Sequence, residues 1–192
     1  MSLTELLLRA LEWVWIAFLI YWMAMSLGNK RVVRRQSLAG RMVQFAVGGL
    51  AFVLLWGRIF QTGPLAHRII PPNVVWIALG LALTCAGIVF AVWARITLGK
   101  NWSGIVTVKQ DHQLIRTGPY RLVRHPIYSG LLLAILGTAV SLGKVRSFLA
   151  VGVILAGWWL KWRAEENFMV QEFGEQYEQY RRETPALIPF AR

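Results

Sequence analysis

The chain is poor in the residues that soluble enzymes use for metal binding and acid–base chemistry. Its 192 residues include one cysteine, three histidines and nine acidic residues. The lone cysteine, Cys85, cannot form an internal disulfide. No histidine, cysteine and carboxylate cluster has the spacing of a metal site, and no glycine-rich turn of the dinucleotide-binding type is present. We therefore predict neither a metal centre nor a Rossmann domain.

Charged residues are also scarce, at 16% of the chain, whereas hydrophobic residues make up 56%. The apolar residues form five blocks, and about 20 such residues span a bilayer. In lipid the backbone must satisfy its own hydrogen bonds, so blocks this continuous predict helices. We expect an all-α, polytopic integral membrane protein of one domain. Its five transmembrane helices, the last two joined as a tight hairpin, are predicted at about residues 6–27, 42–60, 74–96, 127–142 and 148–162.

The first block is expected to remain as an anchor and not to be cleaved as a signal peptide. Glu5 stands in front of it where a signal peptide carries a basic cluster, and no small-residue cleavage site follows.

Lysine and arginine are distributed unevenly between the two predicted sides of the membrane. Sixteen of the 21 basic residues lie in the segments 28–41 and 95–124 and in the region from Lys161 onward, and five lie on the other side. Basic segments tend to stay in the cytoplasm, so we expect the N-terminus outside and the C-terminus in the cytoplasm. The net charge of +12 favours anionic membrane lipids as partners over nucleic acid.

The predicted cytoplasmic connection 97–126 is 30 residues long, and connections of this length are usually functional. We expect a short extended stretch at 104–108 and a turn at 117–119. Pro126 suits the first turn of the fourth helix, because the amide proton it lacks would be unpaired there. Arg124 and His125 then lie at the positive end of a helix dipole, a position suited to an anionic group.

The predicted cytoplasmic tail, residues 163–192, contains most of the acidic residues. Phe173, Tyr177 and Tyr180 recur at spacings of four and three, which predicts an amphipathic tail helix with one aromatic face. We expect this helix to fold back over the 97–126 connection.

The fourth and fifth helices are predicted hairpin partners, so their polar ends should meet. Glu165 and Glu166 follow the fifth block, and His125 precedes the fourth. We therefore expect the two carboxylates to approach His125.

Several other residues are interpreted as structural. Small residues let membrane helices approach closely, and tryptophan is common at membrane interfaces. On these grounds we assign helix packing to Gly80, Gly87, Gly152 and Gly157, and interfacial positions to Trp158, Trp159 and Trp162.

The C-terminal half carries a series of motifs, which in order are Asn101-Trp102, His112-x-Leu114-Ile115, Gly118-Pro119-Tyr120, Arg124-His125-Pro126-x-Tyr128-x-Gly130, Glu165-Glu166, Phe173-Gly174-Glu175-x-Tyr177 and Pro189-Phe190. A lone Arg-His-Pro is a weak signal, whereas the complete series on a membrane protein of this polarity is specific. The series resembles the motifs of the isoprenylcysteine carboxyl methyltransferase family in its five-span form.

The resemblance implies transfer of a methyl group from S-adenosylmethionine to the terminal carboxylate of a prenylated cysteine, which gives a methyl ester. A carboxylate is already ionised at neutral pH, so the reaction needs positioning and electrostatics and no general base. This agrees with a chain that has neither a catalytic dyad nor a metal cluster.

The resemblance also implies which residues hold the cofactor. Extended backbone would bond the adenine edge, aromatic rings would attract the sulfonium, and Glu165 would pair with the amino group. The implied cofactor-binding residues are Thr107, His112, Gln113, Leu114, Ile115, Tyr120, His125, Pro126, Ile127, Tyr128 and Glu165.

For the substrate carboxylate, the resemblance implies a basic residue four positions before Glu165. Lys161 stands there, where the eukaryotic members have arginine. Lysine keeps the charge but lacks the bidentate fork, so Arg163 or Arg124 can share or take this role. The candidate catalytic residues are Arg124, Lys161, Arg163 and Glu166.

Two alternatives remain at this point. One is an NADPH-dependent membrane reductase of the sterol reductase type, whose core and C-terminal motifs are similar. The other is a non-catalytic membrane protein that binds lipid. The Glu165–Glu166 pair and His112-x-Leu114 favour the methyltransferase, whose acceptor and oligomeric state the sequence leaves open.

Overall fold

The computed structural model describes residues 1–26, 32–35, 38–57, 59–60, 62–99, 107–109 and 114–189. Helices dominate this part of the chain, as the predicted all-α class requires. They are α1 (Leu3–Ser26), α2 (Leu38–Trp56), α3 (Val74–Leu98), α4 (Pro126–Leu142), α5 (Val145–Phe173) and α6 (Glu175–Glu183), with the short 3₁₀ helices η1 (Pro64–Ala66) and η3 (Gly118–Arg121).

Each of the first five helices overlaps one of the five predicted apolar blocks, although α2 begins at Leu38 and ends at Trp56 where the prediction was 42–60. Among the described residues, α1, α3 and α5 are long and apolar enough to cross a membrane, and α2 and α4 are shorter apolar helices. Large apolar side chains such as Leu19, Phe52 and Val89 are more than half exposed, a surface that suits lipid and not water. The chain is therefore a helical, polytopic membrane protein.

The fifth helix is longer than its predicted span. α5 continues from the expected end near Trp162 to Phe173, because no glycine or proline interrupts the sequence until Gly174. Gly174 has a φ of 51°, ends α5 and turns the chain into α6. The first part of the predicted tail is thus a continuation of α5.

Two short strands add to the helical fold. β1 (Val32–Arg35) and β2 (Thr107–Lys109) pair antiparallel and so join the α1–α2 connection to the α3–α4 connection. β2 overlaps the predicted extended stretch, whose residues 104–106 lie outside the described residues.

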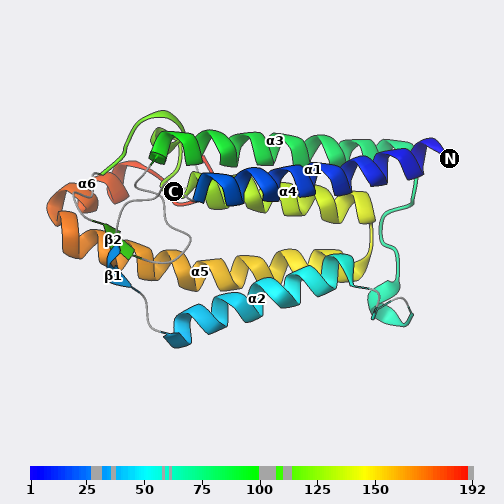
Figure 1. The fold of residues 1–192 in the computed structure, drawn as a ribbon, viewed down its shortest axis with the longest axis horizontal. Coiled ribbons are helices and arrows are strands. Elements are labelled where there is room, and N and C mark those ends of the chain that lie inside the picture. The colour runs from blue at the N-terminus through cyan, green and yellow to red at the C-terminus, as the bar shows by residue number, and fades with distance from the viewer. Residues whose placement is uncertain are drawn as a thin grey trace.

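The helices form two layers, with α1, α3 and α4 in one and α2 and α5 in the other (Figure 1). The strands, α6 and the start of α4 gather at one end of the molecule, and the N-terminus lies at the other (Figure 1). The described parts of the segments rich in lysine and arginine therefore lie towards a common end.

Glycines bring α3 and α4 together. A Cβ added at Gly87 would lie 2.4 Å from the Gly130 carbonyl oxygen, and one added at Gly137 would lie 2.5 Å from the Gly80 carbonyl oxygen. The helix-packing interpretation is confirmed for Gly80 and Gly87 and also for Gly157, which contacts Val47 of α2. It is wrong for Gly152, where an added Cβ would meet nothing within 4 Å.

The second layer is held by a small apolar core and one buried arginine. Leu54 and Ile154 are buried between α2 and α5. Arg146 of α5 donates from Nη1 to the Leu54 and Gly57 carbonyl oxygens, at 2.9 and 2.8 Å, and so caps the end of α2. α5 also follows α4 directly, through a tight turn at Gly143. The polar C-terminal part of α5 therefore lies near both α2 and α4.

Candidate active site

The site begins at the N-terminus of α4. A turn at Gly118, which has a φ of 57°, leads into η3 and buries Tyr120. Pro126 is the first residue of α4, as predicted, and His125 is its N-cap residue. Local sequence therefore fixes where the polar segment ends and the apolar helix starts.

Glu165 and Glu166 of α5 approach His125, as the hairpin argument predicts. The Glu166 Oε1 atom lies 3.1 Å from His125 Nε2 and accepts a 2.8 Å hydrogen bond from Arg124 Nε. Glu165 Oε2 lies 3.9 Å from His125 Nδ1. Both carboxylates are thus at one histidine, whose side chain is only 9% exposed.

Glu166 is held as an anion by three basic groups. Besides Arg124 and His125, Arg181 of α6 places its Nε 3.6 Å from Glu166 Oε2. Glu166 lies on α5 beyond the predicted fifth membrane span, which ends at residue 162. Burial by itself would raise the pKa of Glu166, but the hydrogen bond and charge of His125 and the charge of Arg124 lower this pKa to about 2. We infer that Glu166 orients Arg124 and His125.

Glu165 has a more open environment beside aromatic rings. The Tyr128 hydroxyl donates a 2.7 Å hydrogen bond to Glu165 Oε1, and the Glu165 side chain is 25% exposed. The Tyr128 ring lies 5.2 Å from Trp158, and the His125 ring stacks on Trp162 at 6.1 Å between centroids. We call Trp158, Tyr128, His125 and Trp162 the aromatic wall. An aromatic wall edged by a carboxylate is suited to a cationic ligand.

The three candidate cations for the substrate carboxylate have different surroundings. Arg124 is committed to Glu166 and to two carbonyl oxygens, those of Arg181 at 3.1 Å and Thr184. Arg163 is exposed, and its guanidinium carbon lies 3.9 Å from the Trp159 ring centroid. Lys161 Nζ lies 5.4 Å from the Tyr128 ring centroid. Of the three, the structure brings Lys161 to the aromatic wall.

The chain after α6 folds back over the start of α4, as predicted for the tail. The Arg124 amide donates to the Pro185 carbonyl oxygen at 2.8 Å, and the His125 amide donates to that of Ala186 at 3.0 Å. The expectation of an anionic group at these two residues is therefore wrong for their amides, because the tail's own carbonyl oxygens occupy them.

Side chains secure the same fold-back. The Tyr180 hydroxyl donates a 2.6 Å hydrogen bond to the Tyr120 carbonyl oxygen, and Ser129 Oγ donates to that of Leu187 at 2.6 Å. A tyrosine hydroxyl keeps its proton at neutral pH, and burial raises the pKa of Tyr180 further. The tail helix thus holds η3 and α4 in a fixed relation.

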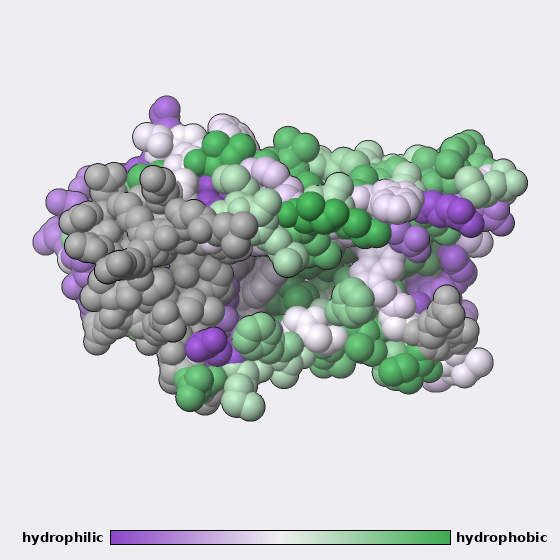
Figure 2. Space-filling model, viewed as in Figure 1, coloured by the Kyte–Doolittle hydropathy of each residue, from purple (hydrophilic) through white to green (hydrophobic). Residues whose placement is uncertain are grey.

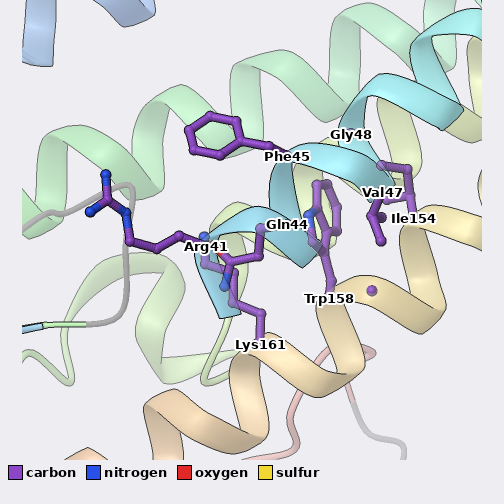
Figure 3. A pocket seen from close by; sticks show the side chains of 9 residues that line it. Arg41, Gln44, Phe45, Val47, Gly48, Ile154, Trp158 and Lys161 are labelled. Atoms are coloured by element: carbon purple, nitrogen blue, oxygen red, sulfur yellow. The ribbon is translucent and has the colours of Figure 1, made fainter. Parts of the chain in front are cut away.

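A pocket of about 200 Å³ lies between α2 and α5 (Figure 3). It adjoins the aromatic wall, because Trp158 belongs to both. Trp158 and Lys161 of α5 line it, and so do Arg41, Phe45 and Gly48 of α2. Sequence motifs gave no indication of a contribution from α2.

The remaining predicted cofactor residues that the structure describes lie before α4 or in its first turn. Leu114, Ile115 and Ile127 are partly buried, and Pro126 is buried. The other predicted contacts, His112, Gln113 and the Thr107 side chain, lie outside the described residues. Across the part of the chain that is described, histidine, cysteine and carboxylate side chains form no group of three or more that suits a metal ion.

Some residues of the site were missed or given another role by sequence reasoning. Arg181 belongs to the ion cluster, and Trp158 and Trp162 belong to the aromatic wall and not simply to a membrane interface. Helical spacing could have indicated the two tryptophans, because Trp158 and Trp162 are one turn apart on the helix face that also carries Lys161 and Glu165.

Comparison with known proteins extends these observations. The family model for phospholipid methyltransferases matches residues 75–176. The chain is 32% identical over 125 residues to protein-S-isoprenylcysteine O-methyltransferase B of Arabidopsis thaliana, with 60% of each chain covered. It is 30% identical over 171 residues to protein-S-isoprenylcysteine O-methyltransferase of Schizosaccharomyces pombe, with 88% of this chain and 71% of the yeast protein covered.

Among solved structures, the chain is similar to the eukaryotic intramembrane Ras methyltransferase ICMT (isoprenylcysteine carboxyl methyltransferase). The TM-score is 0.50 at 25% identity, and the match covers 82% of this chain and 55% of the other. The chain thus spans about 60% of the length of the plant relative and just over half that of the solved structure.

Proposed function

Since the chain belongs to the isoprenylcysteine carboxyl methyltransferase family, we propose that it transfers a methyl group from S-adenosylmethionine to the carboxylate of a lipophilic, prenylcysteine-like acceptor. The resemblance predicted from the C-terminal motifs is confirmed by the relatives. The proposed product is a methyl ester.

The observation that best supports a cationic methyl donor is the aromatic wall with Glu165 at its edge. S-adenosylmethionine carries a sulfonium and an ammonium group, and a wall of rings beside a carboxylate suits both. Tyr128 and His125 would face the donor, and Glu165, which is 25% exposed, would pair with its ammonium group. When bound, S-adenosylmethionine supplies an electrophilic methyl group. Tyr120 and the predicted segment from His112 to Ile115 would complete the donor site.

The chain's own residues would position the acceptor. A carboxylate is ionised at neutral pH, so no protein base is required. Lys161, near the Tyr128 ring, would hold this carboxylate by charge. The Arg124–Glu166–Arg181 cluster would keep His125 in place against Trp162.

We also propose that all five helices α1 to α5 span the membrane, with the N-terminus outside and the site on the cytoplasmic side. In support, α2 and α4 lie alongside the longer spans (Figure 1). The pairing of β1 with β2 joins two of the three basic segments at one end. In a bacterium this membrane would be the inner membrane.

Binding of S-adenosylhomocysteine to purified protein in detergent tests the donor site. We expect the compound to raise the midpoint of thermal unfolding, and we expect Tyr128→Ala and Glu165→Gln each to weaken its affinity at least about tenfold. The control is Trp159→Ala, because Trp159 lies on α5 outside the aromatic wall.

Unchanged affinity in both site variants would contradict the assignment of this site. Stabilisation by NADPH with none by S-adenosylhomocysteine would instead contradict the proposed reaction and favour a membrane reductase.

A further inference from the structure

The pocket between α2 and α5 is continuous with the aromatic wall. Trp158 and Lys161 line the pocket, and both also face Tyr128 of α4, with the Trp158 ring 5.2 Å and Lys161 Nζ 5.4 Å from the Tyr128 ring. A molecule that fills the length of this pocket would therefore have one end at the proposed reaction site.

The pocket has a polar end and an apolar end. α2 and α5 run antiparallel (Figure 1), so Arg41 at the start of α2 and Lys161 of α5 lie at the same end of the pocket. Two helical turns further along, roughly 10 Å away, the lining residues are Gly48 and Ile154. Figure 3 shows Lys161 rising from α5 towards α2 and Trp158 standing between the helices.

Arg41 has two features that favour an anion beside it. A cation in the first turn of a helix lies against the helix dipole, which is unfavourable. In addition, Arg41 Nε is buried and makes no hydrogen bond to the residues that the structure describes, a feature it shares with the Nε atoms of Arg95 and Arg146. An anionic group at this end of the pocket would offset the unfavourable interaction with the dipole and accept a hydrogen bond from Arg41.

Gly48 leaves the apolar end open. A Cβ added there would meet no atom within 4 Å, although glycine is a poor helix former and a larger residue would favour the helix. By contrast, Gly157 on the facing helix already contacts Val47. Figure 2 shows a hollow between the two layers, flanked by apolar residues.

We propose that this pocket binds the methyl acceptor, with its anionic end at Lys161 and Arg41 and its hydrocarbon chain along Phe45, and that Gly48 sets the bulk of the chain that fits. The inference rests on the proposed function, because the acceptor carboxylate must lie beside the donor site. The matched family region starts at residue 75, so α2 is a wall of the pocket outside that region.

Steady-state kinetics with N-acetyl-S-farnesyl-L-cysteine test this pocket. Gly48→Leu is expected to raise the KM for this acceptor about tenfold, with little change in kcat or in the affinity for S-adenosylhomocysteine. The matched control is Gly49→Leu, since Gly49 has the same open surroundings but does not line the pocket. The S-geranyl compound, with its shorter chain, should be less affected by Gly48→Leu.

Arg41→Gln tests the polar end independently of chain bulk. It is expected to raise the KM for the farnesyl and geranyl compounds by the same factor. Equal effects of Gly48→Leu and Gly49→Leu, or no effect of Gly48→Leu and Arg41→Gln, would overturn the inference.

Binding without turnover separates this inference from the proposed function. If the wild type is stabilised by N-acetyl-S-farnesyl-L-cysteine but does not methylate it, and Gly48→Leu abolishes the stabilisation, the pocket is supported and the methyl transfer is contradicted. If the wild type methylates the compound and Gly48→Leu does so with the same KM, the pocket is contradicted alone. A wild type that neither binds nor methylates it contradicts both.

Discussion

At the scale of single residues, the position of a cation around the axis of α5 decides which surface its side chain reaches. Lys161 and Arg163 are two positions apart, which places them about 200° apart around a helix. Lys161 therefore faces Tyr128 and the pocket, whereas Arg163 lies over Trp159 on the exposed side. Charge alone does not separate them, and the direction of each side chain agrees with the motif position that the resemblance gives to Lys161.

Substitution of Lys161 should accordingly affect the acceptor more than substitution of Arg163. We expect Lys161→Met to lower kcat/KM for the prenylcysteine acceptor by about 10- to 100-fold, because one charged hydrogen bond contributes about 1.5–3 kcal/mol. Lys161→Arg should restore much of the loss, and Arg163→Met should stay near wild type. A larger loss in Arg163→Met than in Lys161→Met would show that the wrong cation has been assigned.

Glu166 gives a prediction of pH dependence. Its pKa is lowered from 4.5 to about 2 in the folded protein, where it faces Arg124, His125 and Arg181. A carboxyl whose folded pKa is depressed stabilises the fold above its unfolded pKa, and this contribution is lost as the pH falls from about 4.5 towards 2. We expect the thermal midpoint in detergent to fall over this range in the wild type and to fall less in Glu166→Gln.

Glu175→Gln is the control for this measurement. The Glu175 side chain is 91% exposed, and its ion pair among the described residues is a 3.8 Å contact with Arg182. Its removal should leave the pH profile unchanged. Superimposable profiles for Glu166→Gln and the wild type would show that the buried cluster contributes nothing to stability.

Part of the site follows from local sequence and part does not. Pro126 marks the start of α4, and the hairpin order brings Glu165 and Glu166 to His125, so these features were predicted. The bonding of Arg124 to the Thr184 carbonyl oxygen depends on where a distant segment folds, which no local pattern encodes.

At the scale of elements, α4 is held to α3 by closely approaching backbones. Gly137 lies against Gly80, and Thr84 donates from Oγ1 to the Ala134 carbonyl oxygen at 3.1 Å. Trp15 of α1 adds a 2.9 Å hydrogen bond from Nε1 to Thr138 Oγ1. This packing fixes α4, and with it Tyr128 at the aromatic wall.

Gly137→Leu should therefore destabilise the protein. The added side chain would meet backbone that cannot move away, and overpacking of this kind typically costs about 1–3 kcal/mol or more. Gly152→Leu is the matched control, since nothing lies within 4 Å of an added Cβ there. Thermal unfolding in detergent should show a lower midpoint for Gly137→Leu alone; equal midpoints would contradict the packing described for α3 and α4.

The helices could be predicted more closely than their packing. Apolar block length located α1 to α5, and Gly174 explains why α5 continues past its predicted end. The contribution of α2 to the pocket could not be predicted, because Arg41 and Phe45 belong to no motif and gain meaning only opposite Lys161.

At the scale of the whole molecule, two layers of helices present different surfaces to different ligands. The polar end collects the ion cluster, the aromatic wall and the fold-back after α6, and suits a charged donor from water. The hollow between the layers is flanked by apolar residues and suits an acceptor from the lipid (Figure 2). On this account the two ligands meet between Glu165 and Lys161.

The most direct test of the account is a transfer assay with purified protein in lipid nanodiscs. S-adenosylmethionine labelled in its methyl group and N-acetyl-S-farnesyl-L-cysteine are supplied together, and the extracted lipophilic product is treated with base. The account predicts label in this product and its release as methanol, as a methyl ester requires. Label that remains in the product after base, or no transfer by protein that binds S-adenosylhomocysteine, would contradict it.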